Sequence, residues 1–196
     1  VAADDLTFDN VNVACFTAGA LIETQDGPMA VETLETGTML RTLDHGMQPV
    51  RAVLSRRVAG RGRLAPVVIT KGALGNTTAL IVSPAHRLVI DDWRAEMLFA
   101  QDEVLASAAA LCNGDTIYRC PVAEVTYFHI LMNRHEIIYA AGVPTESYHL
   151  DAEALHDDEV ACELREIFPE LLACASETAR TTLRGFEVKA LQALSV

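Results

Sequence analysis

Hydrophobic and polar positions between Asn10 and Tyr148 form short apolar or alternating runs separated by turn residues. Such runs are typical of β-strands, and many short strands indicate an all-β body. Two intervening segments, Gln25–Gly27 and Leu43–Gly46, carry the Asp and Gly that tight hairpin turns need. The pattern predicts strands at Val11–Phe16, Ala20–Glu23, Met39–Thr42, Val50–Val58, Val67–Thr70, Ala79–Val82, Arg87–Ile90, Thr116–Pro121, Glu124–Leu131 and Glu136–Ala140.

Two parts of the chain depart from this strand pattern. The alanine-rich stretch Leu105–Leu111 has high helix propensity, which predicts a short helix within Gln101–Leu111. From Asp151 onward apolar residues recur three and four apart, most clearly over Val160–Phe168, which predicts amphipathic helices. This C-terminal part carries ten acidic and four basic residues. We interpret it as helices with a solvated face that dock against the β body, with an acidic interaction tail as the alternative.

A short internal repeat links the two halves of the β region. Leu34–Leu40 and Leu111–Ile117 share the pattern Leu-x-x-Gly-x-x-aliphatic, and each leads directly into a predicted strand. A duplicated β subdomain would produce this placement, although so short a match also arises by chance.

Composition narrows the class of protein. The chain has 196 residues, of which 51% are hydrophobic, and 15 Lys+Arg against 27 Asp+Glu give a net charge of −12. This suits one folded domain, with or without an appendage, and excludes a disordered or collagen-like chain. The acidic balance disfavours nucleic acid and anionic membranes as partners. The sequence lacks an initiator Met, a leader pattern and a long apolar run, so we expect no membrane span and no signal peptide.

Cysteine and histidine are the candidate chemical residues. The five cysteines are scattered, without the spacing of a zinc site or a disulfide scaffold. Cys15 begins the first clear strand region, and His86, His129 and His135 lie in or beside later β segments. A thiol needs a nearby base to become a nucleophile, and histidine supplies one. Each residue alone is typical of a structural position, but together they are the components of Cys/His acyl transfer.

Several segments occur in an order that is found in a known family. Ala14–Gly37 looks like an N-terminal block that begins at a self-cleaving Cys, and Ser83–His86 is similar to a Thr-x-x-His block. Val125–Gly142 looks like a late strand pair, and Val143–Ser147 follows it. Together they resemble the hedgehog/intein (Hint) autoprocessing domains, most closely the bacterial hedgehog/intein-like group. The resemblance implies a mainly β, horseshoe-like fold with pseudo-two-fold halves, here followed by C-terminal α-helices.

The resemblance also implies a reaction, an N-to-S acyl shift in which the Cys15 thiol attacks the carbonyl carbon of Ala14. It assigns no cofactor and no metal. It implies that His86 is the general acid at the Cys15 nitrogen and that His129 is the base. Ser83 would orient the scissile peptide or stabilise the oxyanion. His135 would assist resolution of the thioester.

Departures from the family pattern bear on the outcome of the reaction. Thr38 replaces an acid often found after the preceding glycine, which leaves the catalytic set intact. Splicing needs an Asn at the domain end, whereas no Asn follows His135 and Glu136 stands next to it. We therefore expect N-terminal cleavage without splicing, with the flanking polypeptide as substrate and water or a small thiol or amine as acceptor. No sterol acceptor is indicated by the acidic tail.

This interpretation divides the chain into an upstream remnant (residues 1–13), a Hint domain (14–150) and an acidic helical extension (151–196). The compartment does not follow from the sequence, although a place in a larger secreted bacterial protein fits the resemblance. An efficient self-cleaving domain should have lost residues 1–14, so slow, triggered or absent activity fits their presence, as does a short remnant of the upstream partner.

Three alternatives stay open at this point. A catalytically inactive β module within a larger secreted or surface protein would have an unreactive Cys15. A cysteine peptidase or acyl hydrolase acting in trans, with His86 or His129, would cleave added substrates. A zinc site would use His129, His135 and a cysteine, although their spacing lacks a partner Cys pair.

Overall fold

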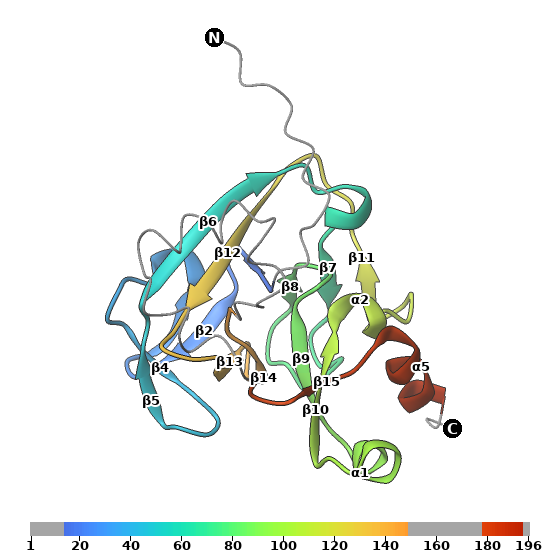
Figure 1. Ribbon diagram of the computed structural model, residues 1–196. Helices are drawn as coiled ribbons and strands as arrows, with labels where there is room; N and C mark the ends of the chain where they lie inside the picture. The colour runs from blue at the N-terminus through green and yellow to red at the C-terminus, as the bar shows by residue number, and fades with distance from the viewer. Residues whose placement is uncertain (1–13, 149–177, 194–196) are drawn as a thin grey trace, which may run out of the picture.

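A computed structural model describes residues 14–148 and 178–193 of the chain. This part is mainly β, with short helices at the edge of the β body (Figure 1). Its strands are β1 (Phe16–Thr17), β2 (Leu21–Thr24), β3 (Gly27–Ala30), β4 (Met39–Arg41), β5 (Met47–Pro49), β6 (Ala52–Val58), β7 (Val67–Ile69), β8 (Leu80–Val82), β9 (Arg87–Asp91), β10 (Glu103–Ser107), β11 (Ile117–Arg119), β12 (Val125–Leu131), β13 (Ile137–Ala140), β14 (Val143–Glu146) and β15 (Thr181–Thr182). The helices are η1 (Val31–Thr33), η2 (Gly62–Leu64), α1 (Trp93–Phe99), α2 (Ala108–Leu111) and α5 (Gly185–Ala193).

The first sheet has the strand order β11-β7-β8-β1-β12-β6, and every pairing in it is antiparallel. Its longest pair is β6 with β12, visible as the two extended neighbouring arrows of Figure 1. The short strand β1 lies between β8 and β12, so both of its edges are paired. The residue that precedes β1 is therefore held between two strands that come from distant parts of the sequence.

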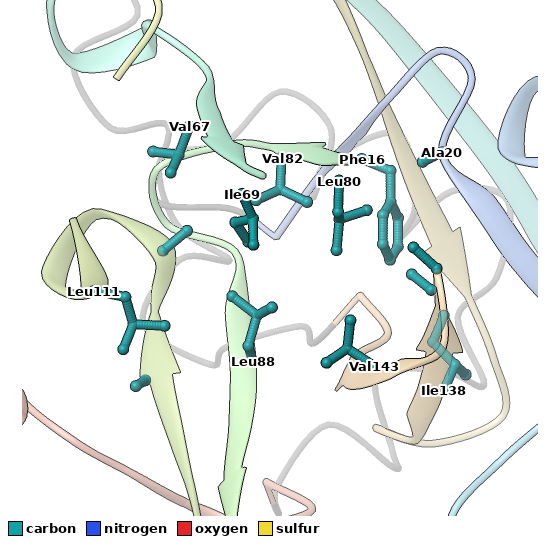
Figure 2. Close-up of a cluster of buried hydrophobic side chains, with 14 of the residues drawn as sticks. Phe16, Ala20, Val67, Ile69, Leu80, Val82, Leu88, Leu111, Ile138 and Val143 are labelled. Atoms are coloured by element: carbon teal, nitrogen blue, oxygen red, sulfur yellow. The ribbon is translucent and has the colours of Figure 1, made fainter. Parts of the chain in front are cut away.

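The second sheet has the order β15-β10-β9-β14-β13-β2-β4-β5, and β3 also pairs with β2. One core cluster joins the two sheets (Figure 2). Phe16, Leu80 and Val82 enter it from the first sheet, and Leu88 and Ile138 from the second. In β8 the buried residues Leu80 and Val82 flank the exposed Ile81, the alternation that a half-buried strand requires. Sequence alternation and packing therefore agree here.

Strand prediction from the sequence is confirmed for most of the β region. Each predicted segment from Ala20–Glu23 to Glu136–Ala140 overlaps an observed strand. Both predicted hairpin turns occur, with Gly27 at φ 105° and Gly46 at φ 66°, a backbone region that glycine enters without a Cβ clash. For Val11–Phe16, only Phe16 lies in a strand, and residues 11–13 are outside the described ranges. The sequence missed β3, β5, β10, β14 and β15.

The predicted helix within Gln101–Leu111 is wrong over its first part. Glu103–Ser107 is strand β10, and only Ala108–Leu111 is helical. The strand forms because it pairs along its whole length with β9, which buries Val104 and Leu105. Tertiary pairing thus overrides the helix propensity of the alanines.

Helix α1 was not predicted from the sequence. It begins after Asp92, whose side chain accepts a hydrogen bond from the backbone N–H of Arg94.

The C-terminal residues 178–193 pack against the β body. Strand β15 adds to the edge of the second sheet in parallel with β10, and α5 packs against α2. Val188 and Leu191 of α5 are buried in the core cluster, so docking of a C-terminal helix is confirmed for α5. The predicted helix Val160–Phe168 lies outside the described residues. No helix within 14–148 or 178–193 is long and apolar enough to cross a membrane.

The internal repeat has the same local structure in both copies. In each copy the leucine is buried, as Leu34 and Leu111, and the glycine has positive φ, 91° at Gly37 and 78° at Gly114. The strands that follow are β4 and β11. The shared sequence pattern therefore corresponds to a shared turn that leads into a strand.

Candidate active site

Cys15 lies directly before β1, where the two neighbouring strands fix its surroundings. Phe16 pairs with Val82 of β8 and with Phe128 of β12. Extending both antiparallel registers by one residue brings Ser83 and His129 opposite Cys15. The backbone confirms this on the β8 side, since the Ser83 N–H donates to the Cys15 carbonyl at 2.9 Å. The buried Cys15 thus lies between Ser83 on one strand and His129 on the other.

His129 contacts both the thiol and the peptide bond that precedes it. Its Nε2 lies 3.5 Å from Cys15 Sγ, and its Nδ1 lies 3.1 Å from the Ala14 carbonyl oxygen. A carbonyl oxygen only accepts, so Nδ1 must carry the hydrogen of the neutral ring. The lone pair of Nε2 therefore faces the thiol. The ring also packs edge-on against Tyr148 at 5.3 Å, which fixes its plane.

Ser83 contacts the nitrogen of the same peptide bond. The Cys15 N–H donates to Ser83 Oγ at 3.1 Å. Three groups of the candidate site, the thiol, Ser83 and His129, therefore surround the Ala14–Cys15 peptide, and Ser83 and His129 are both almost fully buried. Ser83 lies at the nitrogen, and the donor to the carbonyl oxygen is His129.

His86 is held by the turn that joins β8 to β9. The His86 N–H donates to the Ser83 carbonyl at 3.1 Å, which closes the Ser83–His86 turn. The imidazole is fully buried and packs edge-on to Phe16, with ring centroids 4.4 Å apart. Its Nε2 bonds to Thr145 Oγ1, and its Nδ1 has no hydrogen-bond partner in the described part of the chain.

The charge state of His86 follows from this burial. Burial lowers the pKa of His86 to about 4, opposed by the negative charge of Glu146 and assisted by Arg87, His129 and His135. The ring is therefore neutral at pH 7. To act as an acid, as the sequence predicts, it must first take up a proton at Nδ1.

This pKa predicts a pH dependence of stability. The unfolded ring titrates near 6.5 and the folded ring near 4, so between these values the unfolded state binds more protons. The free energy of unfolding should therefore rise with pH by about 3 kcal/mol across that window, and below about pH 4 this contribution is lost. Urea unfolding followed by circular dichroism from pH 4 to 7 measures it.

A His86→Gln variant is the control for this measurement. It removes the titrating ring, so its free energy of unfolding should rise less steeply over the same pH range. Equal slopes for the two proteins would contradict the assignment of this pH dependence to His86.

His135 lies in a different network. Its Nδ1 accepts the Ala179 N–H at 3.0 Å, and its Nε2 lies 3.3 Å from Glu146 Oε2. Glu146 also accepts the Arg87 N–H at 2.8 Å and pairs with the Arg87 guanidinium at 3.2 Å. Burial raises the pKa of Glu146, but the bond from His135 and the charge of Arg87 outweigh it and leave the pKa lowered. Both ring nitrogens of His135 thus face these partners, and its role in thioester resolution stays a prediction.

Sequence reasoning missed two residues that shape the site, Thr145 and Tyr148. Thr145 lies on β14, a strand that was not predicted, and its contact with His86 spans 59 sequence positions. Tyr148 follows β14 and packs on His129. Neither residue type carries a signal by spacing, although Thr145 lies in the segment Val143–Ser147 that the resemblance singled out.

The zinc alternative finds no cluster of ligands in the structure. Among the described residues, no group of three His, Cys, Asp or Glu side chains is arranged to hold a metal ion. His129 faces Cys15, whereas His135 faces Glu146.

Comparison with known proteins gives a family and several structures. Residues 14–152 match the family described as "Hint domain". No curated protein matches the chain significantly. The structure is similar to a DnaB intein from Synechocystis sp. PCC 6803, with 10% identity over 68% of this chain and 98% of that chain, at a TM-score of 0.44. It is also similar to the bacterial intein-like domain from Clostridium thermocellum, with 15% identity over 68% of this chain and 97% of that one, at a TM-score of 0.43.

Proposed function

The chain belongs to the Hint domain family, and from that premise we propose that it cleaves its own backbone at the Ala14–Cys15 bond through a thioester. The observation that carries the proposal is the position of His129, whose two nitrogens contact the Cys15 thiol and the Ala14 carbonyl oxygen. The same ring thus serves the nucleophile and the bond that it attacks.

The first step is attack by the thiol. His129 Nε2 takes the thiol proton, and Cys15 sulfur forms a bond to the carbonyl carbon of Ala14. Nucleophile and electrophile belong to adjacent residues, so no encounter step is needed. As negative charge develops on the Ala14 oxygen, the Nδ1–H of His129 stabilises it, and this donor is stronger once the ring is an imidazolium.

The second step breaks the bond between the Ala14 carbonyl carbon and the Cys15 nitrogen. An amide nitrogen leaves only when it is protonated, so the net reaction moves the thiol proton to this nitrogen. Ser83 Oγ, which accepts the Cys15 N–H, orients the nitrogen. We assign its protonation to His86, because burial makes the His86 imidazolium a strong acid once it forms.

The product is a thioester between Ala14 and the Cys15 side chain. Water, or a small thiol or amine, resolves it and releases the upstream polypeptide, which is the substrate. Splicing is not part of the proposal, because no Asn follows His135 within the matched residues 14–152 to cut a second junction. Metal and cofactor chemistry have no part in these steps.

Burial of the thiol bears on the alternatives. Cys15 has no exposed surface, so an added substrate has no direct path to it, which disfavours a peptidase acting in trans. An inactive β module remains the competing function. The two functions differ in one expected property, the reactivity of the Ala14–Cys15 bond.

Intact-mass analysis of the purified chain near neutral pH tests the proposal. We expect loss of residues 1–14 at a rate that does not depend on protein concentration. Dithiothreitol should accelerate this loss, because its thiol attacks the thioester and stays attached to the released fragment. Hydroxylamine should give the hydroxamate of that fragment. An unchanged mass under all three conditions would reject self-cleavage and favour the inactive module.

A further inference from the structure

We propose that Thr145 is a positioning residue that fixes the proton on Nε2 of His86 and so keeps Nδ1 as the one nitrogen that exchanges protons during cleavage. The inference deepens the proposed function and rests on it for its catalytic consequence. Its structural part, the position of the proton on the ring, is tested separately from cleavage.

The direction of the Thr145 hydroxyl settles which atom donates. Thr145 Oγ1 donates its hydrogen to the Arg87 carbonyl oxygen at 2.9 Å. It can therefore only accept from the second partner, His86 Nε2, so Nε2 carries the hydrogen. The result is a chain of hydrogen bonds from His86 through Thr145 to a backbone carbonyl.

Thr145 is held firmly enough to fix the direction of these hydrogen bonds. It lies fully buried on β14, between β9 and β13, paired with Leu88 on one side and with Ile138 on the other. Arg87, which supplies the accepting carbonyl, is the next residue after His86. Thr145 and Arg87 thus lie on the paired strands β14 and β9 of one sheet, and His86 directly precedes β9.

Nδ1, the other ring nitrogen of His86, is the nitrogen available for proton transfer. His86 Nδ1 is buried without a hydrogen-bond partner in the described residues, an arrangement that costs about 1–3 kcal/mol. The ring packs on Phe16, the residue next to the scissile nitrogen. In the reaction Nδ1 takes up the proton that His129 removed from the Cys15 thiol and gives it to the Cys15 nitrogen as that nitrogen leaves the Ala14 carbonyl carbon, while Nε2–H stays bound to Thr145. No net proton is gained or lost by His86.

Two variants separate the hydroxyl from the shape of the side chain. Thr145→Val keeps the β-branched shape but removes the hydroxyl, so Nε2 loses its acceptor. Thr145→Ser keeps the hydroxyl and loses a methyl group. Thermal unfolding identifies any variant that does not fold, and the serine variant keeps the test valid if valine destabilises the chain.

The direct readout is the ¹⁵N spectrum of the His86 ring at neutral pH, recorded in the Cys15→Ala background and assigned by its loss in His86→Gln. We expect a protonated Nε2 and an unprotonated Nδ1 in the parent and in Thr145→Ser, and a mixture or reversal in Thr145→Val. An unchanged proton position in Thr145→Val would overturn the inference.

The second readout is the rate of cleavage in chains that retain Cys15. We expect a loss of about 10- to 100-fold in Thr145→Val, the size of effect found for hydrogen-bond partners that orient a functional histidine, and near-parent rates in Thr145→Ser. A changed proton position with an unchanged rate would overturn the catalytic part. If the parent does not cleave, the proposed function fails, and the ¹⁵N spectra still decide the structural part.

Discussion

Replacing Cys15 with alanine is expected to abolish the loss of residues 1–14, and replacing it with serine should slow that loss by about 100-fold or more. Alanine removes the only atom that can attack the Ala14 carbonyl in the proposed reaction. A serine hydroxyl is far harder to deprotonate than a thiol, so His129 is a much weaker activator for it. Intact-mass time courses near pH 7 measure both effects.

The serine variant also distinguishes the intermediate. Serine gives an oxygen ester, which hydroxylamine cleaves but dithiothreitol does not, so thiol acceleration should be confined to the parent. Cys120→Ala is the matched control, because Cys120 is a free, partly buried cysteine outside the site. It should cleave at the parent rate. Cleavage at Ala14–Cys15 in Cys15→Ala would contradict a thioester route, whatever its rate.

The part of the site that the sequence predicted depends on strand pairing. Ser83 directly follows β8 and His129 lies within β12, two strands that the sequence pattern predicted. The position of β1 between these two strands cannot be predicted from the sequence. It follows from the pairing of Phe16 with Val82 and Phe128 in the structure. The resemblance to a family supplied the residue set, and the register explains why these residues meet.

The parts that the sequence missed depend on contacts across long sequence separations. Thr145 acts on His86 through β14, a strand whose sequence Val143–Glu146 contains a proline and no clear alternation. Strand β10 was predicted as helix because local helix propensity contains no information about its pairing with β9. His135 received its role from the resemblance, and its contact with Ala179, 44 positions away in the C-terminal part, could not be inferred from the sequence. Local sequence carries none of these tertiary preferences.

Substitution of His129 should give the most informative loss of cleavage, because its two nitrogens have separate tasks. Asparagine brings an amide nitrogen near the position of Nδ1, so His129→Asn keeps a donor to the Ala14 oxygen but loses the base. Glutamine reaches the position of Nε2, so His129→Gln contacts the thiol but loses both the base and that donor. Loss of a general base costs about 10²–10⁴-fold. Loss of an oxyanion donor costs a further 10²–10³-fold or so.

We therefore expect cleavage rates in the order parent, His129→Asn, His129→Gln, measured by intact mass in the presence of dithiothreitol. Raising the pH ionises thiols without help from a base, so alkaline pH should restore more activity to the asparagine variant than to the glutamine variant. Both side chains are smaller than imidazole and lose the packing against Tyr148, so a difference between them reports on the carbonyl donor and not on the missing ring. Equal rates at every pH would mean that the bond from Nδ1 to Ala14 contributes nothing to cleavage, and His129 would then act as a base alone.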